Sequence, residues 1–216
     1  MRSSKVLEMI NSNRIDELKL MLQDEIYEES LKNKPGAKQR YAAMKRYFTY
    51  HKSVREALQK PCEVEYDGSK YISFCNSYSL VLTTEDVGEI ELLEDKSAYP
   101  DVTQLINTNG IENELDFGKA LLEAKIKGYK LNKSEVGPKF KYLIKYSDSY
   151  YKLGLLESTF NIINDGKPCT TYKVKGANKP LVIKNDIGIC VIMPVRYDVN
   201  PEEDDKVVIN VGDENK

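Results

Sequence analysis

The stretch Cys62-Glu-Val-Glu-Tyr-Asp-Gly-Ser-Lys-Tyr-Ile-Ser-Phe-Cys75 decides the fold class. Its first five residues alternate apolar and charged side chains, which is typical of a strand with one buried face. Asp67-Gly68 is a strong signal for a two-residue hairpin turn, and Lys70–Cys75 supplies the returning strand. Strands joined by so short a turn are antiparallel, so this stretch predicts an antiparallel sheet.

The chain downstream repeats this pattern of strands in hairpins, interrupted by two short helices. An α+β fold follows, with antiparallel sheets and the helices on one face. The strands are expected at Ser77–Thr83, Glu89–Leu93, Ile111–Phe117, Phe140–Tyr146, Tyr150–Leu153, Thr170–Lys175, Leu181–Lys184, Ile187–Met193 and Val207–Val211, and the helices at Gly118–Lys127 and Leu155–Ile163.

The first 60 residues predict helices instead. Asn13 is expected to cap a helix whose apolar stripe includes Ile15 and Leu22. A longer helix is expected from Ala37 to Gln59, since apolar residues there recur every three or four positions. They are Tyr41, Met44, Phe48, His51, Val54 and Leu58, and His51 on this stripe predicts a structural histidine.

The 216 residues suffice for one large domain or two small ones. We expect a helical N-terminal segment at 1–60, followed by a β-rich segment at 61–98 that can form part of a first domain. An α+β domain at 99–197 and an acidic tail at 198–216 complete the predicted organisation.

The net charge of -2 conceals a strong asymmetry. Residues 31–60 hold nine basic residues against Glu56 alone, a net charge of +8, whereas residues 61–110 hold two basic and ten acidic residues, a net charge of -8. The basic segment can be an anion-binding surface, or it can be paired internally with the acidic 61–110 segment. The sequence alone leaves both interpretations open.

Enzymatic chemistry finds little support. The only histidine is His51, no two cysteines are closer than 13 residues, and no phosphate-binding or HExxH motif occurs. We therefore expect no enzyme, no metal and no cofactor. Cys62, Cys75 and Cys190 lie in strand patterns, which favours buried, reduced thiols. Acidic clusters such as Glu63 with Glu65 are expected to be solvated, although such a pair can also bind a cation.

Neither a membrane span nor a signal peptide is evident, so we expect a cytoplasmic protein.

Three segments carry a resemblance to a known family. They are Ala98-Tyr-Pro-Asp-Val-Thr-Gln-Leu-Ile106, Tyr151-Lys-Leu-Gly-Leu-Leu-Glu-Ser-Thr-Phe-Asn-Ile-Ile163, and Asn178-Lys-Pro-Leu-Val-Ile-Lys184 followed by Ile189-Cys-Val-Ile-Met-Pro-Val-Arg196. In this order they resemble the bacterial sliding clamp, the beta subunit of DNA polymerase III. The resemblance covers about residues 99–196, and the chain would be a divergent and shortened member of bacterial or phage origin.

The resemblance and the charge pattern together imply two binding surfaces. Duplex DNA would be held without sequence specificity by basic side chains on helices, because such contacts reach phosphates only. The candidates are Lys38, Arg40, Lys45, Arg46, Lys52, Arg55, Lys119, Lys125 and Lys127. In the family, a hydrophobic groove accepts short peptides from polymerases and repair proteins, and the resemblance carries this groove onto Tyr99, Pro100, Met193, Pro194, Val195 and Arg196.

The sequence thus predicts a non-catalytic, clamp-like processivity factor or replication accessory that binds DNA, a partner peptide, or both. Ring closure by so short a chain would require a homo-oligomer. The alternative is an interaction or regulatory protein that keeps the clamp-type fold but does not encircle DNA.

Overall fold

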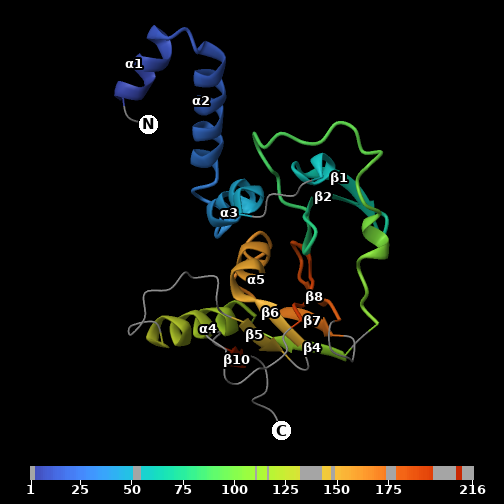
Figure 1. Cartoon of the computed structure of the whole chain (residues 1–216). Helices are drawn as coiled ribbons and strands as arrows, with labels where there is room; N and C mark the ends of the chain where they lie inside the picture. Colours follow the sequence, from blue (N-terminus) through green and yellow to red (C-terminus); the bar gives the residue numbers. More distant parts are fainter. Residues whose placement is uncertain are drawn as a thin grey trace.

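The N-terminal part of the chain is helical, as predicted. The computed structural model describes residues 3–50, 55–109, 111–115, 117–131, 143–146, 149–173, 179–196 and 208–210. Figure 1 shows α1 (Ser3–Asn11) and α2 (Ile15–Ser30) as a hairpin that projects from the body, with the end of α2 reaching α3 (Ala37–Tyr50). The predicted positions His51 and Lys52 lie outside the described residues.

Asn13 ends α1 and does not cap α2, which corrects the sequence-based expectation. Its backbone is left-handed, with φ of 56°. The N–H of Arg14 donates to the carbonyl of Met9 at 2.9 Å, and the N–H of Asn13 donates to that of Ile10 at 3.1 Å. These two bonds close a helix C-terminus in the Schellman pattern, in which asparagine substitutes for glycine.

The single helix expected from Ala37 to Gln59 is also corrected. Within the described residues α3 ends at Tyr50, Arg55 has an extended backbone, and a separate 3-10 turn covers Glu56–Leu58. An extended residue interrupts the hydrogen bonds between residues four apart, so one helix cannot continue through Arg55. Tyr47, absent from the predicted stripe, is fully buried on α3.

Seven strands form the main sheet, in the order β1-β2-β3-β9-β8-β7-β4, and every neighbouring pair is antiparallel. The strands are β1 (Cys62–Tyr66), β2 (Ser69–Cys75), β3 (Ser79–Thr83), β4 (Ile111–Leu115), β7 (Cys169–Lys173), β8 (Leu181–Lys184) and β9 (Gly188–Ile192). Strands β3 and β9 join the two halves, and their close approach depends on Gly188, where a Cβ would overlap the carbonyl oxygen of Leu82.

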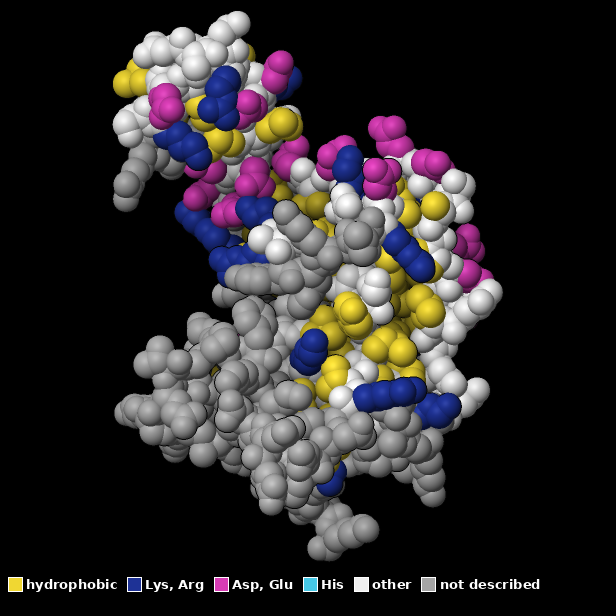
Figure 2. Space-filling model, viewed as in Figure 1, with side chains coloured by type: hydrophobic (Ala, Val, Ile, Leu, Met, Phe, Trp, Pro, Cys, Tyr) yellow, Lys and Arg dark blue, Asp and Glu magenta, His cyan; other side chains and the backbone are white. Residues whose placement is uncertain are grey.

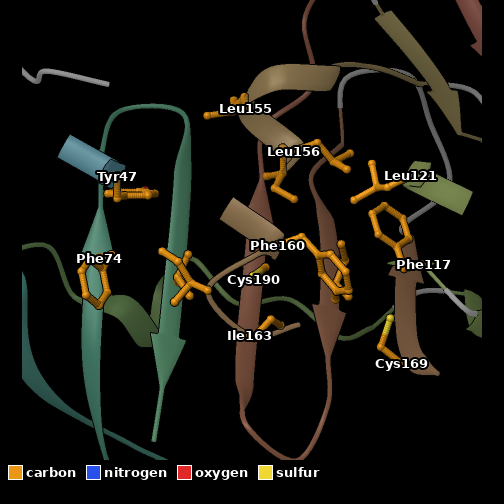
Figure 3. Packing of buried hydrophobic residues seen from close by; sticks show 14 of the residues in the cluster. Tyr47, Phe74, Phe117, Leu121, Leu155, Leu156, Phe160, Ile163, Cys169 and Cys190 are labelled. Atoms are coloured by element: carbon orange, nitrogen blue, oxygen red, sulfur yellow. The ribbon is translucent and has the colours of Figure 1, made fainter. Parts of the chain in front are cut away.

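Two further helices cover one face of this sheet together with α3. They are α4 (Phe117–Leu131) and α5 (Leu153–Phe160). Figure 3 shows Phe160 of α5 and Phe117 of α4 near one another above the strands, and their ring centroids are 5.3 Å apart. The main core forms between these helices and the sheet. The predicted α+β class, with helices on one face of an antiparallel sheet, is confirmed.

A small second sheet has the order β10-β5-β6, with β5 (Leu143–Tyr146), β6 (Ser149–Lys152) and β10 (Val208–Asn210). The pairing of β5 with β6 is antiparallel, but β10 pairs with β5 in parallel. The late strand predicted near Val207–Val211 is thus present, in an orientation that hairpin reasoning does not give, because β10 is far from β5 along the chain.

The outer face of the main sheet carries a second apolar cluster, covered by the segment between β3 and β4. The strand expected at Glu89–Leu93 is absent from this segment, where Leu93 instead donates its N–H to the carbonyl of Pro61 at 2.7 Å. A 3-10 turn at Val102–Gln104 buries Val102 against the cluster. The segment therefore serves as a cover for the outer face.

All four cysteines are buried and free, and Cys62, Cys75 and Cys190 lie in strands, as predicted. Burial raises the pKa of the Cys75 thiol to about 11 and raises that of Cys190 as well. These thiols are therefore protonated near neutral pH. Among the described helices, none is long and apolar enough to cross a membrane.

Candidate functional site

Helix α3 presents its predicted DNA-binding lysines to another helix of the same chain. The ammonium of Lys45 donates to Asp24 at 2.9 Å and to Glu28 at 2.5 Å, both on α2. Lys38 also lies 3.7 Å from Glu28. The basic side of α3 is thus neutralised, at these two positions, by the acidic side of α2.

Tyr41 completes this contact between the two helices. Its hydroxyl donates to Asp24 at 2.6 Å, and the Lys45 ammonium lies 4.8 Å from the centre of its ring. Burial and this hydrogen bond raise the pKa of Tyr41. Partial burial raises the pKa of Asp24, but the bonds from Lys45 and Tyr41 outweigh it, and the pKa is lower than usual. We call Asp24, Glu28, Tyr41 and Lys45 the α2–α3 clasp.

Arg40 is a structural residue in this fold. It is only 5% exposed, and its guanidinium donates to Glu85 at 2.9 Å. Longer bonds reach the carbonyls of Pro35 at 3.3 Å and Asn164 at 3.4 Å. Arg40 therefore ties α3 to the loops after β3 and α5, and its charge faces the interior.

The other predicted DNA-binding residues lie on separate elements of the fold. Arg46 is exposed on α3 and has no ion-pair partner among the described residues, whereas Arg55 follows the helix and has a partner of its own. Lys119 is exposed on α4 and also has an interaction within the chain. Lys125 and Lys127 belong to α4, but their side chains lie outside the described residues.

The acidic segment predicted as the alternative partner contributes fewer contacts. Of the basic residues at 31–60, Arg40 pairs with Glu85 and Lys60 pairs with Glu91. The basic segment is therefore paired within the chain, partly with carboxylates of α2 and partly with carboxylates of the 61–110 segment. In Figure 2, acidic and basic side chains alternate where the hairpin joins the body.

A partly apolar surface lies where β9 ends. The N–H of Met193 donates to the carbonyl of Tyr78 at 2.9 Å, which extends the β3–β9 pairing by one residue. Tyr78 is 63% exposed and Met193 is 43% exposed. Facing residues of an antiparallel pair have neighbouring side chains, so these two form one apolar patch.

The chain then crosses toward the second sheet. Val195 donates its N–H to the carbonyl of Tyr150 in β6 at 2.8 Å, and this bond fixes the path of the segment. Pro194 and Val195 are half-buried, and Arg196 is exposed. We call Tyr78 and Met193–Arg196 the strand-end surface.

Tyr99 is held on the outer apolar cluster, and Pro100 follows it in a half-buried position. The Tyr99 hydroxyl donates to the carbonyl of Ser73 at 3.0 Å, and Ser73 pairs with Leu82, which pairs with Ile189. Ile189 lies on β9, four residues before Met193. Tyr99 thus packs on the outer apolar cluster.

Tyr78 is the binding candidate that sequence reasoning missed. It lies in the turn between β2 and β3, where the Asn76 side chain accepts from the N–H groups of Tyr78 and Ser79, each at 2.8 Å. The Asn-initiated turn could have marked Tyr78 from the sequence, because a tyrosine in such a turn is exposed and available for binding.

The described residues contain no group of three or more histidine, cysteine or acidic side chains placed to hold a metal ion. The Glu63 carboxylate instead lies 3.7 Å from the Lys96 ammonium and 3.9 Å from that of Lys70. This proximity to two lysines favours a solvated acidic residue over a cation ligand.

The chain was compared with protein families, with curated proteins and with solved structures, and only the solved structures gave matches. No protein-family model matches the chain, and no curated protein matches it. The structure is similar to that of a DNA polymerase sliding clamp from Bacillus subtilis, with 12% identity, a TM-score of 0.48, and coverage of 76% of this chain and 63% of that chain. The DNA polymerase III beta subunit of Thermotoga maritima gives 13% identity, a TM-score of 0.46 and the same coverage.

The chain thus spans 63% of the length of each of these two clamps. The family that its sequence resembles is the one to which these structures belong.

Proposed function

We propose that the protein is a non-catalytic binding protein of clamp-type fold that takes a short peptide of a partner protein on its strand-end surface. The observation that carries this proposal is the exposed pair Tyr78 and Met193, held side by side by backbone pairing. The sequence resemblance suggests that the partner is a replication protein.

The chemistry of the surface suits an extended peptide. Tyr78 and Met193 offer apolar contact, and methionine adapts to differently shaped side chains. Arg196, exposed three residues further on, can donate two hydrogen bonds to a carboxylate or carbonyl of the peptide. We therefore expect a ligand with apolar side chains next to an acidic group.

Calorimetry of the full chain with a clamp-binding peptide from a bacterial replication protein tests this proposal. Hydrogen bonds to a charged group contribute about 1.5–3 kcal/mol, so Arg196→Ala should weaken binding by roughly ten- to hundredfold. Arg46→Ala, which removes an exposed arginine on α3, is the matched control and should bind as the parent does. Equal affinity of the Arg196 variant and the parent would remove this surface from the proposal.

Duplex DNA is the second candidate ligand, because α3 and α4 carry Arg46 and Lys119 at exposed positions. The α2–α3 clasp opposes it, since Asp24 and Glu28 occupy the Lys45 ammonium that a phosphate would need. On this hypothesis α2 competes with DNA, and Glu28→Gln should raise DNA affinity.

Fluorescence anisotropy of a labelled duplex at two salt concentrations measures this directly. Bound phosphates give a log–log salt slope of about -0.9 per contact. Absence of salt-sensitive binding in both the parent and Glu28→Gln would leave only the interaction-protein function.

A further inference from the structure

Helix α2 carries an apolar stripe that the described part of the chain does not cover. Ile15, Leu22 and Ile26 are spaced by seven and four residues, which places them within about 40° of one another around the helix. All three are exposed, and Ile26 most of all, at 69%.

The stripe points away from the body. Asp24 and Glu28, which bind α3 in the clasp, lie on the opposite side of α2 from Leu22 and Ile26. Figures 1 and 2 show the hairpin projecting from the body, with hydrophobic side chains on its surface.

Helix α1 covers only the beginning of α2. The two helices have 9 and 16 residues, and hence lengths of about 14 and 24 Å, so roughly 10 Å of α2 extends beyond α1. Met9 and Leu18 are buried near the connection. In turn α1 exposes Leu7 and Ile10.

The exposed apolar area is sufficient for a specific interface. The five residues Leu7, Ile10, Ile15, Leu22 and Ile26 are each 42–69% exposed. Together they present roughly 400 Å² of apolar surface, about half of the ~800 Å² that each partner buries in an interface of standard size. Such interfaces are a little over half apolar, so this area is close to the apolar share that one partner contributes.

We propose that this hairpin is a self-association surface, on which a second copy of the chain packs its own hairpin. The two α2 helices run antiparallel about a two-fold axis near Leu22. Each α1 then lies over the uncovered end of the other copy's α2, next to Ile26. The occupant is a second copy because the hairpin carries both parts of the contact. The end of α2 needs an apolar partner, and the exposed apolar side chains of α1 from a second copy can provide it.

Sedimentation equilibrium of the full chain between 1 and 100 µM tests the proposal. We expect a concentration-dependent dimer, whose dissociation constant rises at least tenfold in Leu22→Asp. The control is Leu105→Asp, because Leu105 is 41% exposed and Leu22 is 42% exposed. A monomeric parent at 100 µM, or a dimer weakened equally by both changes, would overturn it.

Disulfide cross-linking tests the arrangement of the two copies. The native thiols are all buried, so mild oxidation reports an introduced cysteine. Leu22→Cys, near the axis, should form a covalent dimer, whereas Ile15→Cys should not, because the two copies of position 15 would lie about 21 Å apart. Efficient cross-linking at position 15 would contradict the antiparallel arrangement.

Discussion

Helices α5 and α2 are both rich in apolar residues, but α5 is largely buried and α2 is largely exposed. The eight residues of α5 include five that are buried, and α5 contacts β3, β6, β9 and α3. The sixteen residues of α2 include one that is buried, Leu18. Helix α2 is instead attached to α3 by the polar α2–α3 clasp. An apolar stripe therefore shows that a helix has a face to bury, but does not show what covers it.

The largest expected effect is in α5. Leu156 is fully buried in the main core. Leu156→Ala removes its contacts and leaves a cavity, so we expect a loss of about 3–5 kcal/mol in the free energy of unfolding. Urea unfolding followed by far-ultraviolet circular dichroism measures it. A loss below 1 kcal/mol would mean that the core relaxes around α5, and the contrast with α2 would fail.

A smaller effect is expected where α3 is tied to the body. Glu85→Ala leaves the buried Arg40 without its carboxylate partner. Breaking such a pair is costly, although Glu85 is itself partly exposed, so we expect a loss of about 2–3 kcal/mol. Glu91→Ala is the control, since its ion pair with Lys60 is exposed and should contribute less than about 1 kcal/mol. Equal losses would show that the burial of Arg40 has no energetic consequence.

The clasp should respond to acid. The pKa of Asp24 is lowered in the folded protein by bonds from Lys45 and Tyr41. A carboxylate with a lowered pKa stabilises the fold above its unfolded pKa of about 3.9, and this contribution is lost as the pH falls through the folded value. Thermal unfolding should therefore show Asp24→Asn to be less stable than the parent at pH 7.

Near pH 3 the difference between the two proteins should shrink, because the parent then begins to lose the same charge. Since the clasp is partly exposed, the effect at pH 7 should be modest, below that of Glu85→Ala. A difference independent of pH would show that the Asp24 charge does not stabilise the clasp.

The sequence predicted what depends on local chemistry. Asp67 and Gly68 both have a positive φ, 52° and 72°, as a two-residue hairpin turn requires. The strands near Leu181 and Ile189 were found within a residue or two because short continuous apolar runs bounded by turn residues are local signals. The partners of Lys45 could not be predicted, since they depend on how α2 packs against α3.

The same distinction explains the candidate surfaces. Met193 and Arg196 were identified through a resemblance, but Tyr78 lies in a turn more than 100 residues earlier, and the backbone bond that extends the β3–β9 pairing brings it next to Met193. Arg40 was predicted to contact DNA because charge counts do not reveal burial. Helix-spaced basic residues therefore require a structure before they can be assigned to a ligand.

The smallest expected effect is that of Leu20→Ala in α2, the same substitution as Leu156→Ala in α5. Leu20 is 58% exposed and lies on the side of α2 away from the stripe of Ile15, Leu22 and Ile26. Leu20→Ala loses little burial, and alanine favours helix slightly more than leucine does. The free energy of unfolding should therefore change by less than about 0.5 kcal/mol, against several for the same substitution at Leu156. Urea unfolding at about 1 µM, where self-association through the hairpin contributes least, gives the comparison. A loss above 1 kcal/mol at Leu20 would mean that this side of α2 packs against the chain in solution, and that exposure does not distinguish α2 from α5.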